Sequence, residues 1–477
     1  MPLTNTSEAH AAAMDPAVNC RRRTVLVLAF QFPPETGSIQ RVTRYVQYLP
    51  DFGWDPVVLT RRVDSHALAD ASLLGRVAGR AKIRRVGPFP LWRRIRAGLA
   101  PRAASVATKT GPPGGQIRLN DKGFRGIARA CFRTLRRWLL WPDEAIFWLP
   151  SALFAALRQM STRKVDAVYT VSPPHSAHLV GAALKRLTGV RWVADFRDPW
   201  VNDPDLIVPT RLHRAAHSLA EIWVLKNADH LVTTTDFHTR YFRSRLPREA
   251  SGRVQTITNG YDAEEVAGLP VYDGQRFDIT YAGGFCCSRK ATPFLRALSQ
   301  LRARAPGVAS QVFVRLIGGP NPPLEAEVAA FDLQGQVEFT GHLPHRRALE
   351  ELARSAVLLL SVGGDYIAQI SVPAKLFEYM AIRRPVLAIT PPGAAAALVE
   401  ESGCGVVLHP DDVDGIERAI LEYYRQFQRG ELHAASAPEV LRRFERRGLT
   451  ETLSRLLAGV ETLNRGDEEL TADAGQG

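Results

Sequence analysis

The chain has 477 residues, a length typical of two to four domains. Apolar residues make up 45% and charged residues 23%, a soluble globular composition that excludes a wholly disordered, collagenous or multi-span membrane protein. The net charge of +13 is unevenly distributed, because 17 Lys/Arg and one acid, Asp121, lie between Leu73 and Arg137. The rest of the chain is therefore close to neutral.

The two ends and the cysteines carry no recognisable chemistry. Residues 1–22 lack periodicity and are predicted to be a flexible leader, and residues 465–477 a flexible tail. The apolar run Val25–Phe30 is too short for a signal peptide or a spanning helix of about 20 residues. The five scattered cysteines indicate neither a disulfide framework nor a zinc cluster. These features favour a cytosolic protein.

Short aliphatic runs alternate with helical patterns along the chain, which predicts parallel sheets covered by helices. The turn-rich stretch 259–276 separates two series of such runs and is expected to link an N-terminal domain (23–258) to a C-terminal one (277–435), followed by a helical segment (436–464). The expected strands are 24–30, 56–60, 166–171, 191–195 and 230–234 in the first series, and 277–282, 312–318, 336–340, 356–361, 385–390 and 405–408 in the second.

Ligands of such sheets bind at the carboxyl ends of the strands. In the first domain, Gly37 lies in a proline-rich loop before a helix expected near Ile39, where the backbone can approach a ligand. An ordinary turn is the alternative. Asp195 and Asp198 flank Arg197 in the loop after another strand. These carboxylates are candidate functional groups, with a buried Asp–Arg pair as the structural alternative.

In the second domain, Gly283 and Gly284 follow a strand, and Arg289 and Lys290 precede a helix expected near Thr292. Amide donors and cations that converge at a helix start can bind phosphate, although a solvated basic turn has the same composition.

A second feature of this domain is the run from Ser371 to Ala381, which predicts a loop leading into an amphipathic helix. Lys375 and Glu378 share one face of that helix. They form either a helix ion pair or a site for a phosphate and a ribose.

Taken in order, these motifs resemble the GT-B glycosyltransferases, in particular the retaining family 4 enzymes that use nucleotide sugars. The resemblance covers roughly residues 24–460. It rests on Phe32-Pro33-Pro34-Glu35-Thr36-Gly37, the run Tyr48–Pro56, Ser172-Pro173-Pro174-His175-Ser176-Ala177-His178, the loop Asp195–Trp200, Thr258-Asn259-Gly260-Tyr261-Asp262 and the segment Pro373–Met380. The resemblance implies two Rossmann-like domains that face a central cleft, with the donor nucleotide held by the second domain and a C-terminal helix that returns to the first.

The same resemblance implies roles on the donor side. Glu378 matches the second acid of the E-x7-E element and would bind the ribose, whereas Ile370 stands where the first acid is expected. Arg289 and Lys290 would grip the diphosphate. The loop with His342 and Leu343 would contact the nucleobase, without distinguishing uracil from guanine.

The acceptor side is implied to carry the catalytic groups. Asp195 and Asp198 occupy the loop where many members have a histidine, and His175 is a rival polar group in the cleft. No tightly bound cofactor is expected, and the donor is expected to be linked to UDP or GDP.

No metal is expected either. The two Asp-x-Asp sequences, 203–205 and 412–414, follow no strand end of a nucleotide-binding unit and are interpreted as turn or helix-start acids. The sequence also lacks G-x-x-x-x-G-K-[S/T], H-E-x-x-H and G-x-S-x-G motifs.

The basic stretch, about 73–141, is predicted to be an insertion that contacts an anionic membrane, since cations stand beside tryptophans and leucines. Packing of Trp138–Trp148 on the sheet is the alternative. Nucleic-acid binding is the rival class, but the stretch has no recognition helix, zinc finger or RNP pattern, and no nucleic-acid partner is expected. A GT-B epimerase or hydrolase is the third hypothesis. The sequence thus predicts a peripheral cytoplasmic glycosyltransferase with a glycan or polyprenyl-linked saccharide as acceptor.

Overall fold

The structure is a computed structural model of the chain. It describes residues 21–35, 39–63, 72–88, 141–203, 206, 208–285, 289–432 and 437–460. Gly37, most of the basic stretch and both ends of the chain lie outside these ranges. Among the described residues, no helix is both long enough and apolar enough to cross a bilayer.

The first domain is built on a parallel sheet with seven strands among the described residues, in the order β3-β2-β1-β4-β5-β6-β7. The central strands are buried almost throughout, as expected where helices cover both faces. The order reverses between β1 and β4, so their carboxyl ends open a crevice. The strands are β1 (Arg23–Leu28), β2 (Trp54–Arg61), β3 (Lys82–Val86), β4 (Ala167–Ser172), β5 (Arg191–Phe196), β6 (His230–Thr233) and β7 (Val254–Thr256).

The second domain repeats this plan with six strands in its described part, in the order β10-β9-β8-β11-β12-β13. All described pairings in the two sheets are parallel, which confirms the predicted pair of Rossmann-like α/β domains. The strands are β8 (Phe277–Ala282), β9 (Val312–Ile317), β10 (Val337–Gly341), β11 (Val357–Ser361), β12 (Val386–Ile389) and β13 (Gly405–Leu408).

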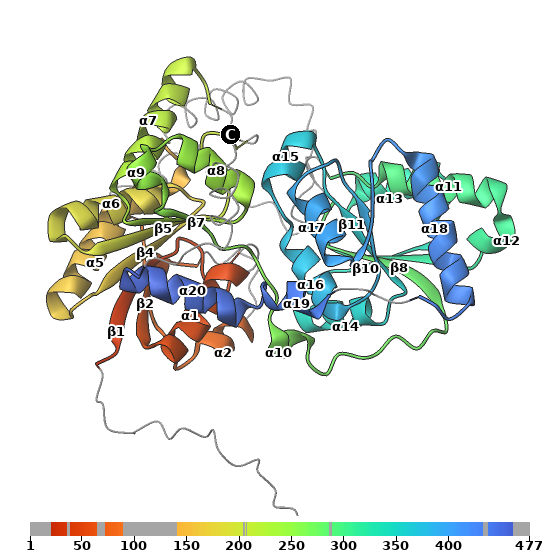
Figure 1. Cartoon of the computed structure of the whole chain (residues 1–477), viewed down its shortest axis with the longest axis horizontal. Helices are drawn as coiled ribbons and strands as arrows, with labels where there is room; N and C mark the ends of the chain where they lie inside the picture. The colour runs from red at the N-terminus through yellow and green to blue at the C-terminus, as the bar shows by residue number, and fades with distance from the viewer. Residues whose placement is uncertain are drawn as a thin grey trace, which may run out of the picture.

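Helices cover both sheets, and the short linker between them carries α10 (Figure 1). The first domain contains α1 (Gln40–Tyr48), the 3-10 turn Leu49–Phe52, α2 (Ser72–Val77), the 3-10 turn Glu144–Phe147, α5 (Leu149–Thr162), α6 (Ser176–Thr188), α7 (Arg211–Asn227), α8 (Asp236–Ser244) and α9 (Arg248–Ser251). The rest of the chain contains α10 (Ala263–Val266), α11 (Thr292–Arg304), α12 (Pro306–Ala309), α13 (Pro322–Ala330), α14 (His345–Ala353), α15 (Asp365–Ile370), α16 (Ala374–Ile382), α17 (Ala394–Ser402), α18 (Val413–Gln428), α19 (Pro438–Arg442) and α20 (Arg446–Ala458).

The last helix, α20, lies on the first domain beside α1 (Figure 1). Leu453, Leu456 and Leu457 are fully buried there in one hydrophobic cluster with β1, β4 and α1. Burial of such a side chain contributes about 1.5–3 kcal/mol. The chain therefore crosses between the domains twice, once through α10 and once before α20.

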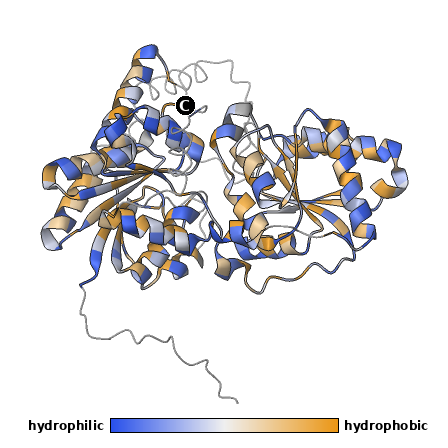
Figure 2. Ribbon diagram, in the orientation of Figure 1, coloured by the Kyte–Doolittle hydropathy of each residue, from blue (hydrophilic) through white to orange (hydrophobic). Residues whose placement is uncertain are grey.

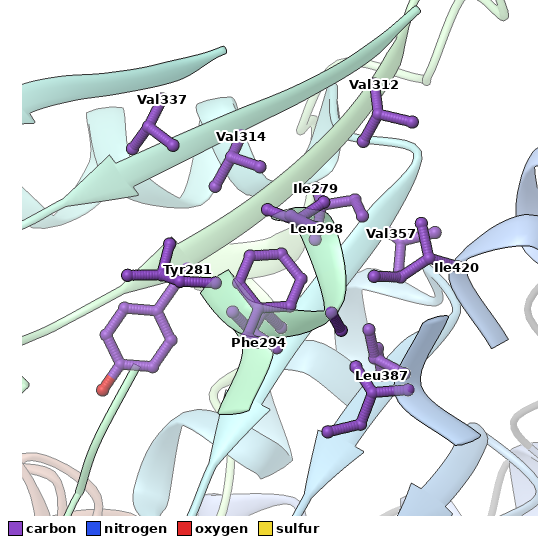
Figure 3. Close-up of a cluster of buried hydrophobic side chains, with 14 of the residues drawn as sticks. Ile279, Tyr281, Phe294, Leu298, Val312, Val314, Val337, Val357, Leu387 and Ile420 are labelled. Atoms are coloured by element: carbon purple, nitrogen blue, oxygen red, sulfur yellow. The ribbon is translucent and has the colours of Figure 1, made fainter. Parts of the chain in front are cut away.

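Each domain has its own apolar core, and the strands of both sheets are mostly hydrophobic while the helices carry both hydrophobic and hydrophilic residues (Figure 2). In the second domain, Ile279, Tyr281 and Phe294 pack between the sheet and α11 (Figure 3). The core holds the carboxyl ends of β8 to β11 at fixed positions, and the candidate site is built on those ends.

The composition of the basic stretch predicts a single insertion, but the structure uses both of its ends within the first domain. Residues 82–86 form edge strand β3, which pairs in register with β2. At the other end, Trp148 is buried and Trp141 packs against the same core. The prediction was therefore wrong for these two ends, since the sheet and the core use them, and only residues 89–140 lie outside the structure's description.

Candidate active site

The donor-side candidate residues lie at the carboxyl edge of the second sheet. Gly283, directly after β8, has φ of +124°, and a Cβ there would lie 2.8 Å from Lys375 Nζ. A Cβ at Gly318, after β9, would lie 2.6 Å from the Gly283 carbonyl oxygen. Glycine is thus required at Gly283 by the positive φ and at Gly318 by the close approach of the Gly283 backbone, and Lys375 meets the first of these loops. The exposed backbone of Gly283 and Gly284 is open to a ligand at this edge.

The neighbouring loops complete this edge. Ser361, at the end of β11, donates a hydrogen bond from Oγ to the Lys290 carbonyl (3.3 Å), which fixes the Arg289–Lys290 segment beside the sheet. Gly341, the last residue of β10, accepts a hydrogen bond at its carbonyl from the Gly318 amide (3.1 Å) and leads into exposed His342 and half-buried Leu343. The structure therefore brings the predicted glycine, cation and nucleobase loops to one edge.

Helix α16 supplies the two remaining donor-side groups. Pro373 caps its start, and Leu376, Phe377 and Met380 bury its other face. Lys375 Nζ lies 3.9 Å from the centre of the Tyr281 ring, a cation–π contact that holds the ammonium beside the Gly283 loop.

The second of these groups, Glu378, faces a different neighbour. Its Oε1 lies 3.7 Å from His345 Nε2. Burial raises the pKa of Glu378, and the charges of His345 and Arg446 oppose that rise.

Glu378 belongs to a chain of charges that runs from the second domain to the first. His345 Nε2, at the start of α14, also lies 3.4 Å from Glu265 Oε1 on α10. Burial by itself lowers the pKa of His345, but the nearby Glu265 and Glu378 outweigh burial and raise it. The raised pKa favours the protonated, positively charged imidazole, which lies between two carboxylates.

Glu265 is the centre of this cluster. It pairs with three arginines from the first domain and from α20: Arg44, Arg76 (2.8 Å) and Arg446 (3.6 Å). Burial alone would raise its pKa, yet His345 and the arginines lower it to about 2. Each member is buried or half-buried, so these ion pairs are only weakly screened by salt.

The ligand atoms of Glu265, His345 and Glu378 lie within 4.8 Å of one another, a spacing that could hold a metal. However, three guanidinium groups already pair with Glu265, and their positive charge opposes a further cation. We therefore interpret the cluster as an interdomain ion network.

On the acceptor side, Asp195 is completely buried at the end of β5. Arg41 Nε donates to Asp195 Oδ2 (2.9 Å), and the Tyr169 hydroxyl donates to the same carboxylate. Arg41 also donates to the carbonyls of Ile257 (2.8 Å) and Thr258 (2.6 Å). Asp195 thus fixes the loop after β7, which matches the structural alternative, and we do not retain it as a group that touches substrate.

Asp198 and His175 remain on the acceptor side. The Asp198 side chain is 44% exposed and accepts hydrogen bonds from Arg197 Nε (3.1 Å) and Nη2 (3.0 Å). His175 is 8% exposed and stacks on Trp200 with ring centres 4.6 Å apart. Its Nδ1 has no hydrogen-bond partner in the described part of the chain. Asp198 is therefore the more accessible of the two groups.

The two sets of residues meet across the domain junction. Thr235, which caps α8 after β6, donates from Oγ1 to the Ile370 carbonyl at the end of α15 (2.9 Å). Phe237 and Tyr366 make an edge-to-face contact at the same junction (6.4 Å). Ile370 is 6% exposed, so the residue that replaces the expected acid packs between the domains.

His175 belongs to a buried cluster of histidines and aromatic rings. His178 lies against Phe196 (4.3 Å between ring centres), and His238 lies against Phe242 (4.2 Å). Burial lowers the pKa of His178 and of His238 to about 3. Burial, followed by the neighbouring histidines, lowers the pKa of His175 well below its usual value. The folded domain therefore keeps these imidazoles neutral.

We expect this cluster to make the first domain acid-labile. The unfolded chain binds these protons near pH 6.5, so the stabilisation is fully present above that pH and is lost as pH falls toward about 3. At pH 5 the expected loss is about 2 kcal/mol for His178 and the same for His238. A His238→Phe variant should show a shallower fall of unfolding free energy between pH 6.5 and 5. His409→Phe, an exposed site in the other domain, is the control, and equal slopes in wild type and His238→Phe would contradict the assignment.

Sequence reasoning missed the residues that join the domains. Glu265, His345 and Arg446 lie on α10, α14 and α20 and share no local motif. One signal was present, however: Arg41 and Arg44 stand three apart on a short helix, α1, whose other positions are largely buried. Cations on such a helix indicate buried acidic partners elsewhere in the fold.

Comparison with known proteins agrees with this geometry. Residues 36–260 match the family described as "Glycosyl transferase 4-like domain", and residues 276–426 match "Glycosyl transferases group 1". No curated protein sequence matches the chain. The fold and both sequence matches define a glycosyltransferase, and the chain belongs to the GT-B glycosyltransferases.

Solved structures share the whole fold at low sequence identity. Sucrose-phosphate synthase from Thermosynechococcus elongatus aligns with a TM-score of 0.64 and 16% identity over 92% of this chain and 99% of its own. An α,α-trehalose-phosphate synthase (UDP-forming) from Burkholderia xenovorans aligns with a TM-score of 0.59 and 15% identity (91% and 100% covered). WaaG, a glycosyltransferase involved in lipopolysaccharide biosynthesis, aligns with a TM-score of 0.55 and 13% identity (91% and 100% covered).

Proposed function

We propose that the protein transfers a sugar from a UDP- or GDP-linked donor to a hydroxyl of a glycan or lipid-linked saccharide, with retention, as family 4 enzymes do. The observation that carries the proposal is the meeting of Lys375 and the Gly283–Gly284 loop, one helical turn from Glu378. A diphosphate needs cations and amide donors, and a ribose needs a carboxylate that accepts from two hydroxyls. Lys375, the Gly283–Gly284 loop and Glu378 supply groups of each of these kinds.

In this proposal the protein supplies charge neutralisation and alignment. Lys375, Arg289 and Lys290 would offset the negative charge that grows on the departing nucleoside diphosphate. Cations can do this without a metal, so none is assigned. His342 and Leu343 would contact the nucleobase.

The first domain would hold the acceptor hydroxyl near the anomeric carbon, which favours reaction by proximity. Asp198, after β5, and His175, after β4, are the proposed polar groups, and the buried Asp195–Arg41 pair would hold the neighbouring loop after β7 in place. The contact between Thr235 and Ile370 supports this placement, because the chain enters α16 only a few residues after Ile370.

The proposed setting is the biosynthesis of a cell-surface polysaccharide or glycolipid on the cytoplasmic face of an anionic membrane. It is supported by the 12 cations of residues 89–140, which stand against a single acid, and by the structural likeness to a lipopolysaccharide glycosyltransferase. An epimerase or hydrolase would use the same donor site without an acceptor.

A thermal-shift panel of UDP, GDP, AMP and common UDP- and GDP-sugars tests the donor site. A ligand at 100 times its dissociation constant stabilises the folded protein by about 2.7 kcal/mol. We expect UDP or GDP, but not AMP, to raise the melting temperature. The double variant Arg289→Ala/Lys290→Ala should lose most of that shift. If no nucleotide stabilises the wild-type protein, the proposed function fails.

A further inference from the structure

Helix α7 has two apolar faces, and only one of them packs on the protein. Ala220, Val224 and Leu225 enter the core of the first domain. On the other side, Leu212 is 78% exposed, Leu219 69% and Trp223 42%. Residues spaced by seven and by eleven lie about two and three turns apart, so these three side chains form a line along the helix. A single exposed leucine is ordinary, but an aligned row with a tryptophan requires an explanation.

The charges on α7 favour one kind of partner. Arg211, Arg214 and Lys226 are exposed, whereas the helix has a single acid, Glu221, which is buried. Glu221 accepts hydrogen bonds from the Val201 amide (3.0 Å) and from the Tyr241 hydroxyl (3.2 Å). At roughly 100° per residue, Lys226 lies about 40° and Arg211 about 100° from the row of Leu212, Leu219 and Trp223, whereas Arg214 lies on the opposite side. The outer face of α7 therefore presents apolar side chains with one cation beside them, a second at its margin, and no acid.

The basic stretch ends beside this helix. Residues 89–140 contain 12 Lys/Arg and a single acid, and the described chain resumes at Trp141. The Trp141 ring lies 6.1 Å from the ring of His217, on α7. His217 in turn accepts a hydrogen bond at Nδ1 from Trp200 (2.9 Å). The end of the basic stretch at Trp141 is thereby anchored next to α7.

We propose that the outer face of α7, defined by Leu212, Leu219 and Trp223, inserts into the headgroup layer of an anionic bilayer. Leucine and tryptophan on one helix face with flanking cations are typical of helices that lie in the membrane interface. The role of this membrane contact, which is to bring a lipid-linked acceptor to the enzyme, rests on the proposed function.

The position of α7 suits that purpose. Through Glu221 and Tyr241 the helix is tied to α8, and α8 contacts α15 across the domain junction. Figure 1 shows α7 and α8 at the same end of the first domain, on the side where α15 of the second domain faces them. A bilayer at α7 would therefore lie next to the junction where the two halves of the candidate active site meet.

Co-sedimentation with vesicles tests the proposal. The full chain should bind vesicles of phosphatidylglycerol and phosphatidylcholine better than phosphatidylcholine alone. A Leu212→Gln/Leu219→Gln/Trp223→Gln variant should bind the anionic vesicles about tenfold more weakly or worse, since affinity scales with the buried apolar area. The matched control is Phe154→Gln/Leu187→Gln, which alters two side chains of the same domain that are 69% and 63% exposed. This control should bind vesicles like the wild type.

Three outcomes overturn the proposal. In the first, the α7 variant binds anionic vesicles as well as the control does. In the second, the wild type elutes as a dimer and the α7 variant as a monomer, which makes the face an interface between copies of the chain. In the third, the wild type binds no vesicles. Nucleotide-induced thermal shifts, measured on the same samples, separate this proposal from the proposed function. If the α7 variant loses vesicle binding but keeps the nucleotide-induced thermal shift, both the docking surface and the donor site are supported. If vesicle binding depends on α7 but no nucleotide gives a thermal shift, the docking surface is supported and the donor site is ruled out.

Discussion

Replacing Glu378 with alanine should weaken nucleotide-sugar binding by about one to two orders of magnitude. A hydrogen bond to a charged group contributes about 1.5–3 kcal/mol, and each factor of ten in affinity corresponds to about 1.4 kcal/mol. The fold should survive, because His345 keeps its contact with Glu265 and the side chain of Glu378 is only partly buried. Isothermal titration calorimetry with UDP or GDP measures the effect.

The matched control for this variant is Glu400→Ala, which removes an exposed carboxylate from α17 of the same domain. It should bind the nucleotide like the wild type. Equal affinity in Glu378→Ala and in the control would show that the carboxylate does not meet the ribose, and Glu378 would then belong only to the interdomain ion network.

Replacing Arg41 with methionine should strongly destabilise the first domain. The change removes the cation that pairs with the Asp195 carboxylate, which stays fully buried. Breaking a buried ion pair in this way lowers the free energy of unfolding by about 3–5 kcal/mol. For a domain of this size the melting temperature should fall by on the order of 10 °C. Differential scanning calorimetry measures this fall.

Arg197→Met is the control for this second prediction, because its pair with Asp198 is partly exposed and such pairs contribute only about 0–1 kcal/mol. If Arg41→Met melts like this control, the network around Asp195 is not structural. A variant that keeps wild-type stability but loses turnover would return Asp195 to the candidate catalytic groups.

The sequence was sufficient to predict the fold because most buried strands of both sheets consist of short aliphatic runs. Its failures have physical reasons. Edge strand β3, Lys82–Val86, has cations at three of its five positions and lacks such a run, and β7 has only three residues. The local sequence of such a segment does not predict its position at the sheet edge or its partner strand, because the hydrogen bonds that make it a strand come from the neighbouring strand.

The candidate site was predictable where its chemistry is local. Lys375 and Glu378 share a helix, and Gly283 directly follows a strand, so sequence spacing placed them at the sheet edge. The ion network around Glu265 was not predictable, because its members come from six helices that only the tertiary fold brings together. Asp195 illustrates the same limit, since the sequence could not say whether a carboxylate after a strand meets a substrate or a buried arginine.

Mass spectrometry of the reaction mixture tests the central claim most directly. The chain is incubated with the nucleotide sugar that stabilises it and with a polyprenyl-linked saccharide, in the presence of a metal chelator. The account predicts that the acceptor gains the mass of one sugar residue, with release of an equal amount of nucleoside diphosphate. Release of the diphosphate with free sugar and an unchanged acceptor would identify a hydrolase, and a donor converted to its epimer would identify an epimerase; either result would contradict the account.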